Sequence, residues 1–202
     1  MSKTSSGDYF EDFRIGQVIA HATPRTVTSG DRALYGALYP TRFALSSSDV
    51  FAAASGLSPA PVEELIGFHI AFGKTVPDVS LNAVANLGYA ECRFHRPVRP
   101  GDTVSASAGV VGLKGICKGR SGVVWVRSTA RNQHGETVID WARWVMVRKR
   151  RIDAPAPAPV SPAHAPAVAA RALILPAGLE FSGDAVVAAR APHRRADDAE
   201  GE

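Results

Sequence analysis

The sequence predicts one α+β domain in which a curved antiparallel sheet wraps around a long buried helix. Residues 62–72 have the length and apolar character of a core helix, and four strand-like segments follow between residues 83 and 147. After residue 152 the composition changes to alternating proline and alanine, which marks the end of the domain. The chain has 202 residues, 46% of them hydrophobic, which is enough for one core.

Two short helices are expected before the core helix. Thr28 and Ser29 precede the first, over 31–38, and such hydroxyl side chains suit a helix cap. Ser48 and Asp49 open the second, over 50–54, which Gly56 ends.

The core helix is expected over 62–72, with Pro61 in its first turn and Gly73 just beyond its end. Its apolar side chains are distributed nearly all round the helical axis. A helix of this kind is buried on every side, so this pattern predicts a helix enclosed by the sheet.

The strand-like segments are rich in β-branched and small residues, and they cover 83–94, 103–111, 123–130 and 137–147. The last two flank a glycine-bearing loop at 132–135, which predicts a hairpin. Alternation along the final strand places five side chains on one face, namely Ile139, Trp141, Arg143, Val145 and Val147. Arg143 is the one charged group among them.

These patterns divide the chain into two parts. Residues 1–152 are the predicted domain, and residues 153–202 are a Pro/Ala-rich linker leading to a disordered or truncated tail. The net charge is +4, and the basic run at 148–151 is interpreted as a solvated strand end rather than a nucleic-acid site, because no recognition motif accompanies it.

The expected location is the cytoplasm. The chain has neither a membrane-length apolar run nor an apolar signal core near residue 1. Cys92 and Cys117 lie in strand-like segments and are expected to be buried thiols rather than a disulfide. No cluster of cysteine and histidine has metal-ligand spacing, so no metal site is predicted.

Several segments together resemble the MaoC-like dehydratases, which have the hotdog fold. They are the entry segment 9–17, the strand–turn–strand segment 83–104 and the hairpin 132–136. The resemblance implies reversible hydration of an unsaturated acyl-CoA thioester. Coenzyme A is then part of the substrate, and no further cofactor is expected. It also implies a homodimer, or pairing with a second hotdog half, with neither nucleic acid nor membrane as partner.

Within that family, the segments 43–49, 68–78 and 143–150 resemble the N-terminal half of the mesaconyl-CoA hydratases, also called β-methylmalyl-CoA dehydratases. Those enzymes resemble two hotdog halves joined in one chain. Two readings stay open: the chain is one half of such a hydratase, or it is a non-catalytic module that binds acyl-CoA or dimerises.

The acid–base pair of the family is not matched. Typical MaoC-like hydratases carry an Asp and a His five positions apart on the loop before a short helix. The resemblance places these two positions at Thr41 and Ser46, whose hydroxyls are not general bases near neutral pH. This difference favours the non-catalytic reading for the isolated chain, whereas the close local match to one hydratase favours the hydratase half by descent.

Four residues are candidates for chemistry or binding. His69 and Asp49 are the catalytic candidates, although a core histidine and a helix-start carboxylate are the more frequent roles of such residues. Arg42 and Lys74 are candidates for binding the free carboxylate of a dicarboxylic acyl group, against the alternative of solvated surface charges.

Overall fold

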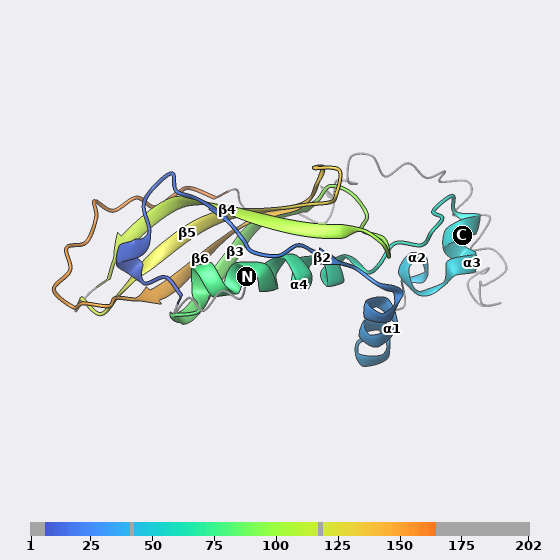
Figure 1. Ribbon diagram of the computed structural model, residues 1–202, viewed down its shortest axis with the longest axis horizontal. Coiled ribbons are helices and arrows are strands. Elements are labelled where there is room, and N and C mark those ends of the chain that lie inside the picture. The colour runs from blue at the N-terminus through green and yellow to red at the C-terminus, as the bar shows by residue number, and fades with distance from the viewer. Residues whose placement is uncertain (1–6, 41–42, 117–118, 165–202) are drawn as a thin grey trace, which may run out of the picture.

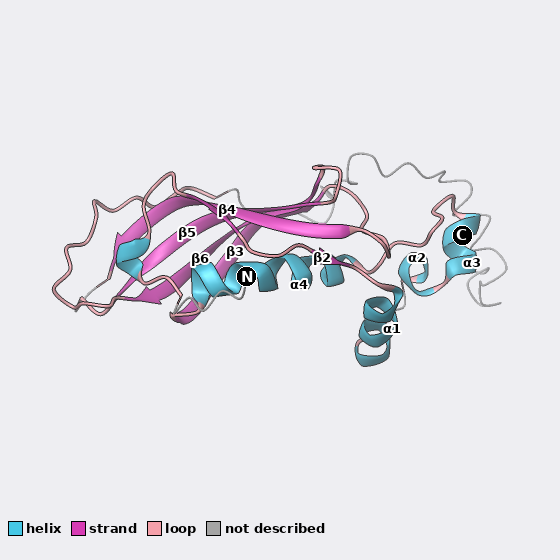
Figure 2. Ribbon diagram, in the orientation of Figure 1, coloured by secondary structure: helices cyan, strands magenta, loops and turns pink. Residues whose placement is uncertain are grey.

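A computed structural model describes residues 7–40, 43–116 and 119–164. A curved antiparallel sheet lies over one long helix, and the shorter helices gather at one end of the molecule (Figures 1 and 2). The elements run in the order η1 (Phe10–Asp12), β1 (Val18–Ala20), β2 (Arg25–Thr26), α1 (Ser29–Leu38), α2 (Ala44–Ser47), α3 (Asp49–Ala54), α4 (Glu64–Thr75), the π-helical η2 (Val76–Ser80), β3 (Ala83–Phe94), β4 (Thr103–Gly115), β5 (Ser121–Arg131) and β6 (Thr137–Arg148).

The sheet has the strand order β1-β4-β5-β6-β3, and β2 pairs with the first two residues of β4. All of these pairings are antiparallel. The four predicted strands are therefore confirmed, with β4 continuing to Gly115. The short strand β1 was not predicted, because three residues are too few to show alternation. Strand β2 lies in the segment 25–28, which resembles the strand-to-helix junction of the MaoC-like dehydratases.

The core helix begins later than predicted. The backbone N–H of Val62 donates to the Val98 carbonyl at 2.8 Å, which holds Pro61 and Val62 in an extended segment beside the β3–β4 turn. The Glu63 carboxylate then caps the helix by accepting from the Leu65 N–H at 3.0 Å. At the other end α4 continues through Gly73 to Thr75.

Burial of α4 is confined to one face, so the prediction of a helix enclosed on all sides is wrong. Ile66, Gly67, Ile70 and Ala71 are buried against the sheet, whereas Leu65 is 44% exposed. A Cβ on Gly67 would lie 3.3 Å from Ile139 Cδ1. The absence of a side chain at this position therefore lets the helix lie close to β6.

Two apolar clusters fill the space under the sheet. The first lies between α4 and the sheet, and its largest members are Ile66, Ile70, Ile139 and Trp141. The second lies where the entry segment, η2 and the strands meet, and it comprises Phe10, Phe13, Val79, Ala108, Val110, Leu113, Val124, Val126, Val145 and Val147. Strands β4 to β6 supply seven of the ten buried residues of the second cluster and five of the eleven of the first.

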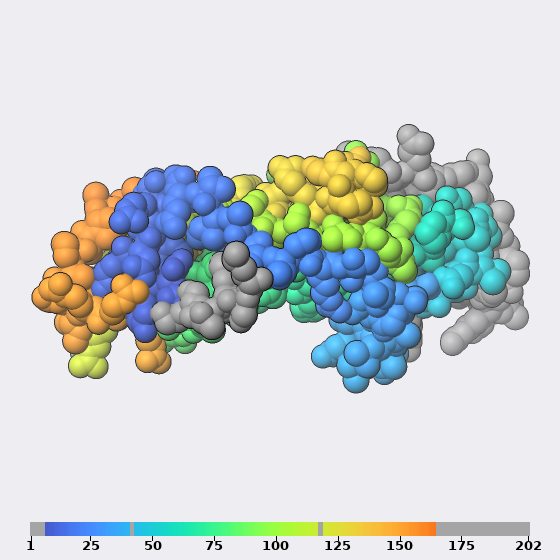
Figure 3. Space-filling view, in the orientation of Figure 1, coloured from blue at the N-terminus to red at the C-terminus, as the bar shows by residue number. Residues whose placement is uncertain are grey.

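Helix α1 stands out from the body of the molecule, as the space-filling view shows (Figure 3). Thr28 caps it as predicted, accepting from the Asp31 N–H at 3.2 Å. None of its residues is buried, and Leu34 and Leu38 are each 63% exposed. Helix α3 is also confirmed, with Ser48 as its N-cap. The single-turn helix α2 was not predicted.

The first part of the Pro/Ala segment packs along β4. Val160 and Leu113 exchange backbone hydrogen bonds of 2.8 and 2.9 Å, and the His164 ring stacks on Trp144 with centroids 4.9 Å apart. The basic run lies nearby, where the Arg150 guanidinium pairs with Asp12 at 2.8 Å. The remainder of the predicted tail lies outside the described residues.

Two further observations concern the expected location. The described helices include none with the length and hydropathy needed to cross a membrane. Cys92 is exposed, so the prediction of a buried thiol is wrong there, and Cys117 lies outside the described residues. Cys92 belongs to β3, where register shifts against β6 alter the alternation of inward and outward side chains.

Candidate functional site

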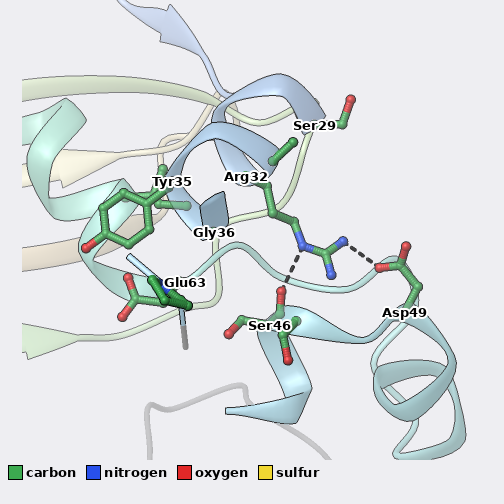
Figure 4. A pocket seen from close by; sticks show the side chains of 11 residues that line it. Ser29, Arg32, Tyr35, Gly36, Ser46, Asp49 and Glu63 are labelled. Atoms are coloured by element: carbon green, nitrogen blue, oxygen red, sulfur yellow. Dashed lines mark hydrogen bonds and ion pairs between the residues drawn. The ribbon is translucent and has the colours of Figure 1, made fainter. Parts of the chain in front are cut away.

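A cavity with a volume of about 420 Å³ lies where α1, α2 and the start of α3 face the beginning of α4 (Figure 4). Its lining side chains come from four helices and the segments between them. They are Ser29, Arg32, Ala33, Tyr35, Gly36, Pro40, Ser46, Ser47, Asp49, Glu63 and Ile66. The cavity therefore borders the loop on which the family resemblance places the acid–base pair.

Arg32 holds two of these elements together. Its Nε donates to the Ser46 carbonyl at 2.8 Å, and its Nη1 pairs with the Asp49 carboxylate (Figure 4). Both contacts use donors of one rigid, planar guanidinium, so they fix α2 and α3 relative to α1. The arrangement places a positive charge at one side of the cavity.

Glu63 and Tyr35 form the other side of the cavity. Burial is the main cause that raises the pKa of Glu63, and the Glu64 carboxylate raises it further, while the Leu65 N–H and His69 act in the opposite direction. Burial also raises the pKa of Tyr35, as does the nearby negative charge of Glu63. A carboxyl group with a raised pKa beside a cavity is a candidate proton donor or acceptor.

His69 is exposed, so the interpretation of this residue as a buried core histidine is wrong. It lies on the face of α4 that points away from the sheet, next to exposed Leu65. Its ring centroid is 6.1 Å from that of Tyr35 and 5.9 Å from that of Phe68. The structure therefore places His69 beside a residue that lines the cavity, although His69 is not itself among the lining residues.

Asp49 is the first residue of α3, and its side chain is 76% exposed. Its carboxylate pairs with the Arg32 guanidinium at the margin of the cavity. This position agrees with the helix-start role that the sequence favoured, and the ion pair adds a second role in joining α1 to α3. Its assignment as a displaced general base stays a prediction.

The remaining predicted residues do not come together at the cavity. Lys74 lies at the far end of α4, where its ammonium donates to the Thr23 carbonyl and burial lowers its pKa. Arg42 and Thr41 lie outside the described residues. Ser46 is buried, and its hydroxyl donates to the Phe43 carbonyl at 3.2 Å.

Three cavity residues were missed by the sequence analysis: Arg32, Tyr35 and Glu63. Arg32 and Tyr35 lie three residues apart on one face of α1, which is a weak signal for a shared site. Glu63 is followed by a second glutamate and lies at a helix start, where acidic residues are common. Only the folded arrangement shows that the three face one cavity.

A buried histidine–carboxylate pair lies elsewhere in the fold. His21 Nδ1 and Asp78 Oδ2 are 2.7 Å apart, between the end of β1 and η2. Neither residue lines the cavity. Within residues 7–40, 43–116 and 119–164, no group of three or more His, Cys, Asp or Glu side chains is arranged to hold a metal ion.

A smaller, more apolar pocket of about 70 Å³ lies on the other side of the start of α4. Its lining is mainly hydrophobic and comprises Phe43, Leu45, Leu57, Pro61, Val62, Glu64, Phe94, Arg96, Pro97, Val98 and Ile139. The two pockets share the α2 region, which is therefore bordered by a polar cavity on one side and an apolar one on the other.

The chain has close relatives of known name. It is 60% identical over 200 residues to a mesaconyl-CoA hydratase from Cereibacter sphaeroides, a match that covers 99% of this chain and 58% of the relative. A solved MaoC domain protein from Chloroflexus aurantiacus superposes with a TM-score of 0.82 at 55% identity, covering 87% of this chain and 50% of the other. The chain thus spans about half the length of these relatives.

A more distant solved structure has a double hotdog fold. A double-hotdog protein from Mycobacterium tuberculosis matches with a TM-score of 0.64 and 28% identity. The match covers 78% of this chain and 53% of the other. The family described as MaoC like domain matches residues 11–132. With its antiparallel sheet wrapped over α4, the chain therefore belongs to the MaoC-like domain family and has the hotdog fold.

Proposed function

We propose that the chain is one half of an acyl-CoA hydratase of the mesaconyl-CoA type, which reversibly hydrates mesaconyl-CoA to β-methylmalyl-CoA. The observation that carries this proposal is the 60% identity to a mesaconyl-CoA hydratase over nearly the whole chain, together with coverage of only 58% of that relative. The uncovered part of the relative is long enough for a second hotdog domain.

Hydration of an enoyl thioester needs two things from the protein. A base must activate water while an acid protonates the α carbon, and hydrogen-bond donors must stabilise the charge that develops on the thioester oxygen. Ser46 hydrogen-bonds to its own loop, and neither it nor Thr41 is a general base. We therefore assign the principal acid–base pair to the second half, and substrate shaping to this one.

The cavity residues of this half would position the substrate. Arg32 supplies a cation that is already held in place by Ser46 and Asp49. Glu63, with its raised pKa, supplies a carboxyl group that can hold a proton closer to neutral pH than an exposed glutamate can. These groups are preorganised by helix starts and short loops rather than by the substrate itself.

Pairing with a second hotdog half would occur along β3. This strand ends the described sheet, and Leu87 and Tyr89 on it are 42% and 47% exposed. An open strand edge with exposed apolar side chains is suited to pairing with another sheet. The exposed face of α4, with Leu65 and His69, adjoins this edge and would be covered at the same time.

A complementation assay tests this proposal. The chain is incubated with mesaconyl-CoA, alone and with the separately produced second half of the Cereibacter sphaeroides relative, and loss of the enoyl thioester absorbance is followed. We expect hydration by the mixture and little or none by either half alone. Absence of hydration by an associated mixture would contradict the proposed reaction.

The second candidate function is a non-catalytic module that binds acyl-CoA or dimerises. The observation that favours it is the exposed apolar surface on β3 and α1, which includes Leu87 and Leu34. If this function is correct, the chain binds a coenzyme A thioester or forms a dimer, but the mixture with a second half does not hydrate it. The expectations of a cytoplasmic location and of no separate cofactor stay predictions.

A further inference from the structure

A fully buried arginine lies in the core without a counter-charge. Arg143 projects from β6 toward α4, and its side chain has 0% exposure. Its Nη2 donates to the Ser80 hydroxyl over a long 3.5 Å, whereas its Nε and Nη1 have no hydrogen-bond partner in the part of the chain that the structure describes. No carboxylate among those residues forms an ion pair with it.

The surroundings of Arg143 are aromatic. Its guanidinium carbon lies 4.6 Å from the centroid of the Phe72 ring on α4. Tyr89 is opposite Arg143 in the β3–β6 register, and its ring centroid is 6.0 Å from that of Phe72. Aromatic faces stabilise a cation only modestly, so they do not replace the lost hydration of a buried guanidinium.

The same face of β6 carries a second unsatisfied donor. The Nε1 of Trp141 is buried, and within the described ranges it has no hydrogen-bond partner. Trp141 precedes Arg143 by two residues and packs against Phe68, with ring centroids 5.3 Å apart. The unsatisfied atoms of Arg143 and Trp141 are all donors, so a ligand with several acceptor atoms would satisfy them.

The position of the site permits a ligand to reach it. Phe72 is half-buried, and Tyr89, on the last strand of the described sheet, is 47% exposed. On that side Arg143 is therefore covered by the side chains of Phe72 and Tyr89. These side chains lie on the face where we place the second half. Burial lowers the pKa of Arg143 to about 10, so the guanidinium still carries its charge at neutral pH.

We propose that Arg143 is an anion-binding residue that receives a carboxylate through its planar fork. We assign that carboxylate to the acyl group of a dicarboxylic thioester, an assignment that rests on the proposed function. A carboxylate side chain of the facing half has the same chemistry and is the other source. In either case the fork supplies two parallel N–H groups to the two oxygens.

The test compares two thioesters that differ only at the far end of the acyl group. Mesaconyl-CoA carries a carboxylate where 2-methylcrotonyl-CoA carries a methyl group. Because the paired halves are expected to hydrate mesaconyl-CoA, each thioester is first brought to its hydration equilibrium. The apparent dissociation constant of the total thioester is then measured by equilibrium dialysis on the full chain paired with the second half, for the wild type, Arg143→Met and Arg143→Lys. Arg148→Met is the matched control, because Arg148 is an exposed arginine on the same strand.

We expect the wild type to prefer mesaconyl-CoA by about ten- to a hundredfold, the range for a hydrogen bond to a charged group. Arg143→Met should reduce this preference to about threefold or less and leave binding of 2-methylcrotonyl-CoA unchanged. Arg148→Met should keep the full preference. Arg143→Lys keeps a charge but loses the fork, so it should show an intermediate preference. If the Met variant does not fold, the Lys variant takes its place in the test.

A second measurement distinguishes the two sources of the carboxylate. If it belongs to the facing half, Arg143→Met weakens association of the halves at least tenfold by sedimentation, while the thioester preference is retained. If neither the preference nor the association changes, the anion site is overturned. Both measurements report binding, so failure of the complementation assay would contradict the hydratase reaction without deciding the role of Arg143.

Discussion

At the scale of single residues, Glu63 combines two roles that depend on the same carboxylate. It caps α4 by accepting from the Leu65 N–H, and it faces the cavity beside Tyr35. Burial raises its pKa above the ordinary value of 4.5, so the folded chain binds a proton at this site more readily than the unfolded chain does. Its contribution to stability is therefore present at low pH and is lost as the pH rises through the raised pKa.

This linkage predicts the behaviour of Glu63→Gln, which keeps an acceptor for the cap but cannot ionise. The free energy of unfolding of the wild type should fall relative to that of the variant as the pH rises from 4.5 toward neutrality. The difference should stay below about 1 kcal/mol, because the site is partly solvated. Urea unfolding at several pH values measures it, and parallel pH curves for the two proteins would refute the raised pKa.

His69 gives a second prediction at this scale. Its ring lies beside Tyr35 at the cavity and is not held in the core. In the assembled enzyme we expect His69→Ala to raise KM for mesaconyl-CoA and to change kcat by less than about tenfold, because the loss of a general acid or base costs about a hundredfold or more. His134→Ala, at an exposed hairpin turn, is the matched control and should change neither constant.

The opposite outcome for His69 is equally informative. A hundredfold or greater drop in kcat, with a changed pH profile, would place proton transfer on this half and contradict the assignment of catalysis to the second one. Asp49→Asn provides a comparison within the same cavity, because its carboxylate is paired with Arg32 and is mostly exposed.

The sequence was a poor guide to the site at the residue scale. It indicated the loop around Ser46 through the family resemblance, and that loop does border the cavity. It did not single out Glu63 or Tyr35, because the raised pKa of each depends on burial created by α1 and α4 together. Side chains that meet only across a tertiary contact leave no spacing signal in one sequence.

At the scale of elements, the contact between α4 and the sheet fixes the depth of the core. Gly67 makes that contact possible, since a Cβ there would approach Ile139 at 3.3 Å and Val98 at 3.4 Å. Gly73, on the same helix, has no neighbouring atom within 4 Å of such a Cβ. A substitution at Gly67 therefore tests packing against the sheet, whereas a substitution at Gly73 tests helix propensity.

Substitution of these glycines should change stability in opposite directions. Gly67→Leu is expected to lower the free energy of unfolding by about 1–3 kcal/mol or more through overpacking. Gly73→Ala should raise it by about 0.5–1 kcal/mol, because alanine favours a helix more than glycine does. Urea denaturation of both variants measures this, and equal effects at the two sites would contradict the close approach of α4 to β6.

Long elements were predicted well from the sequence, and their ends were not. The strands β4 to β6 show alternation over most of their eleven to thirteen residues, which is a strong local signal. The start of α4 depends on the hydrogen bond between Val62 and Val98, which joins segments far apart in the chain. The exposed face of α4 was mistaken for a core face, because it carries apolar side chains such as Leu65 as well.

At the scale of the whole molecule, the proposed pairing along β3 predicts how association can be broken. Leu87→Asp places a charge on the exposed face of this strand and should weaken association with the second half at least tenfold. Val50→Asp is the matched control, since Val50 is an exposed apolar residue of α3, away from β3. Sedimentation velocity measures both, and equal association of the two variants would contradict pairing through β3.

The most direct test of the account is the hydration of mesaconyl-CoA by the chain with and without a second hotdog half. The central claim is that this chain supplies the scaffold and substrate cavity of a hydratase, while the acid–base pair lies in the other half. The account predicts that the associated halves remove the enoyl absorbance and that this chain alone does not. Full turnover by this chain alone, or none by the associated halves, would contradict it.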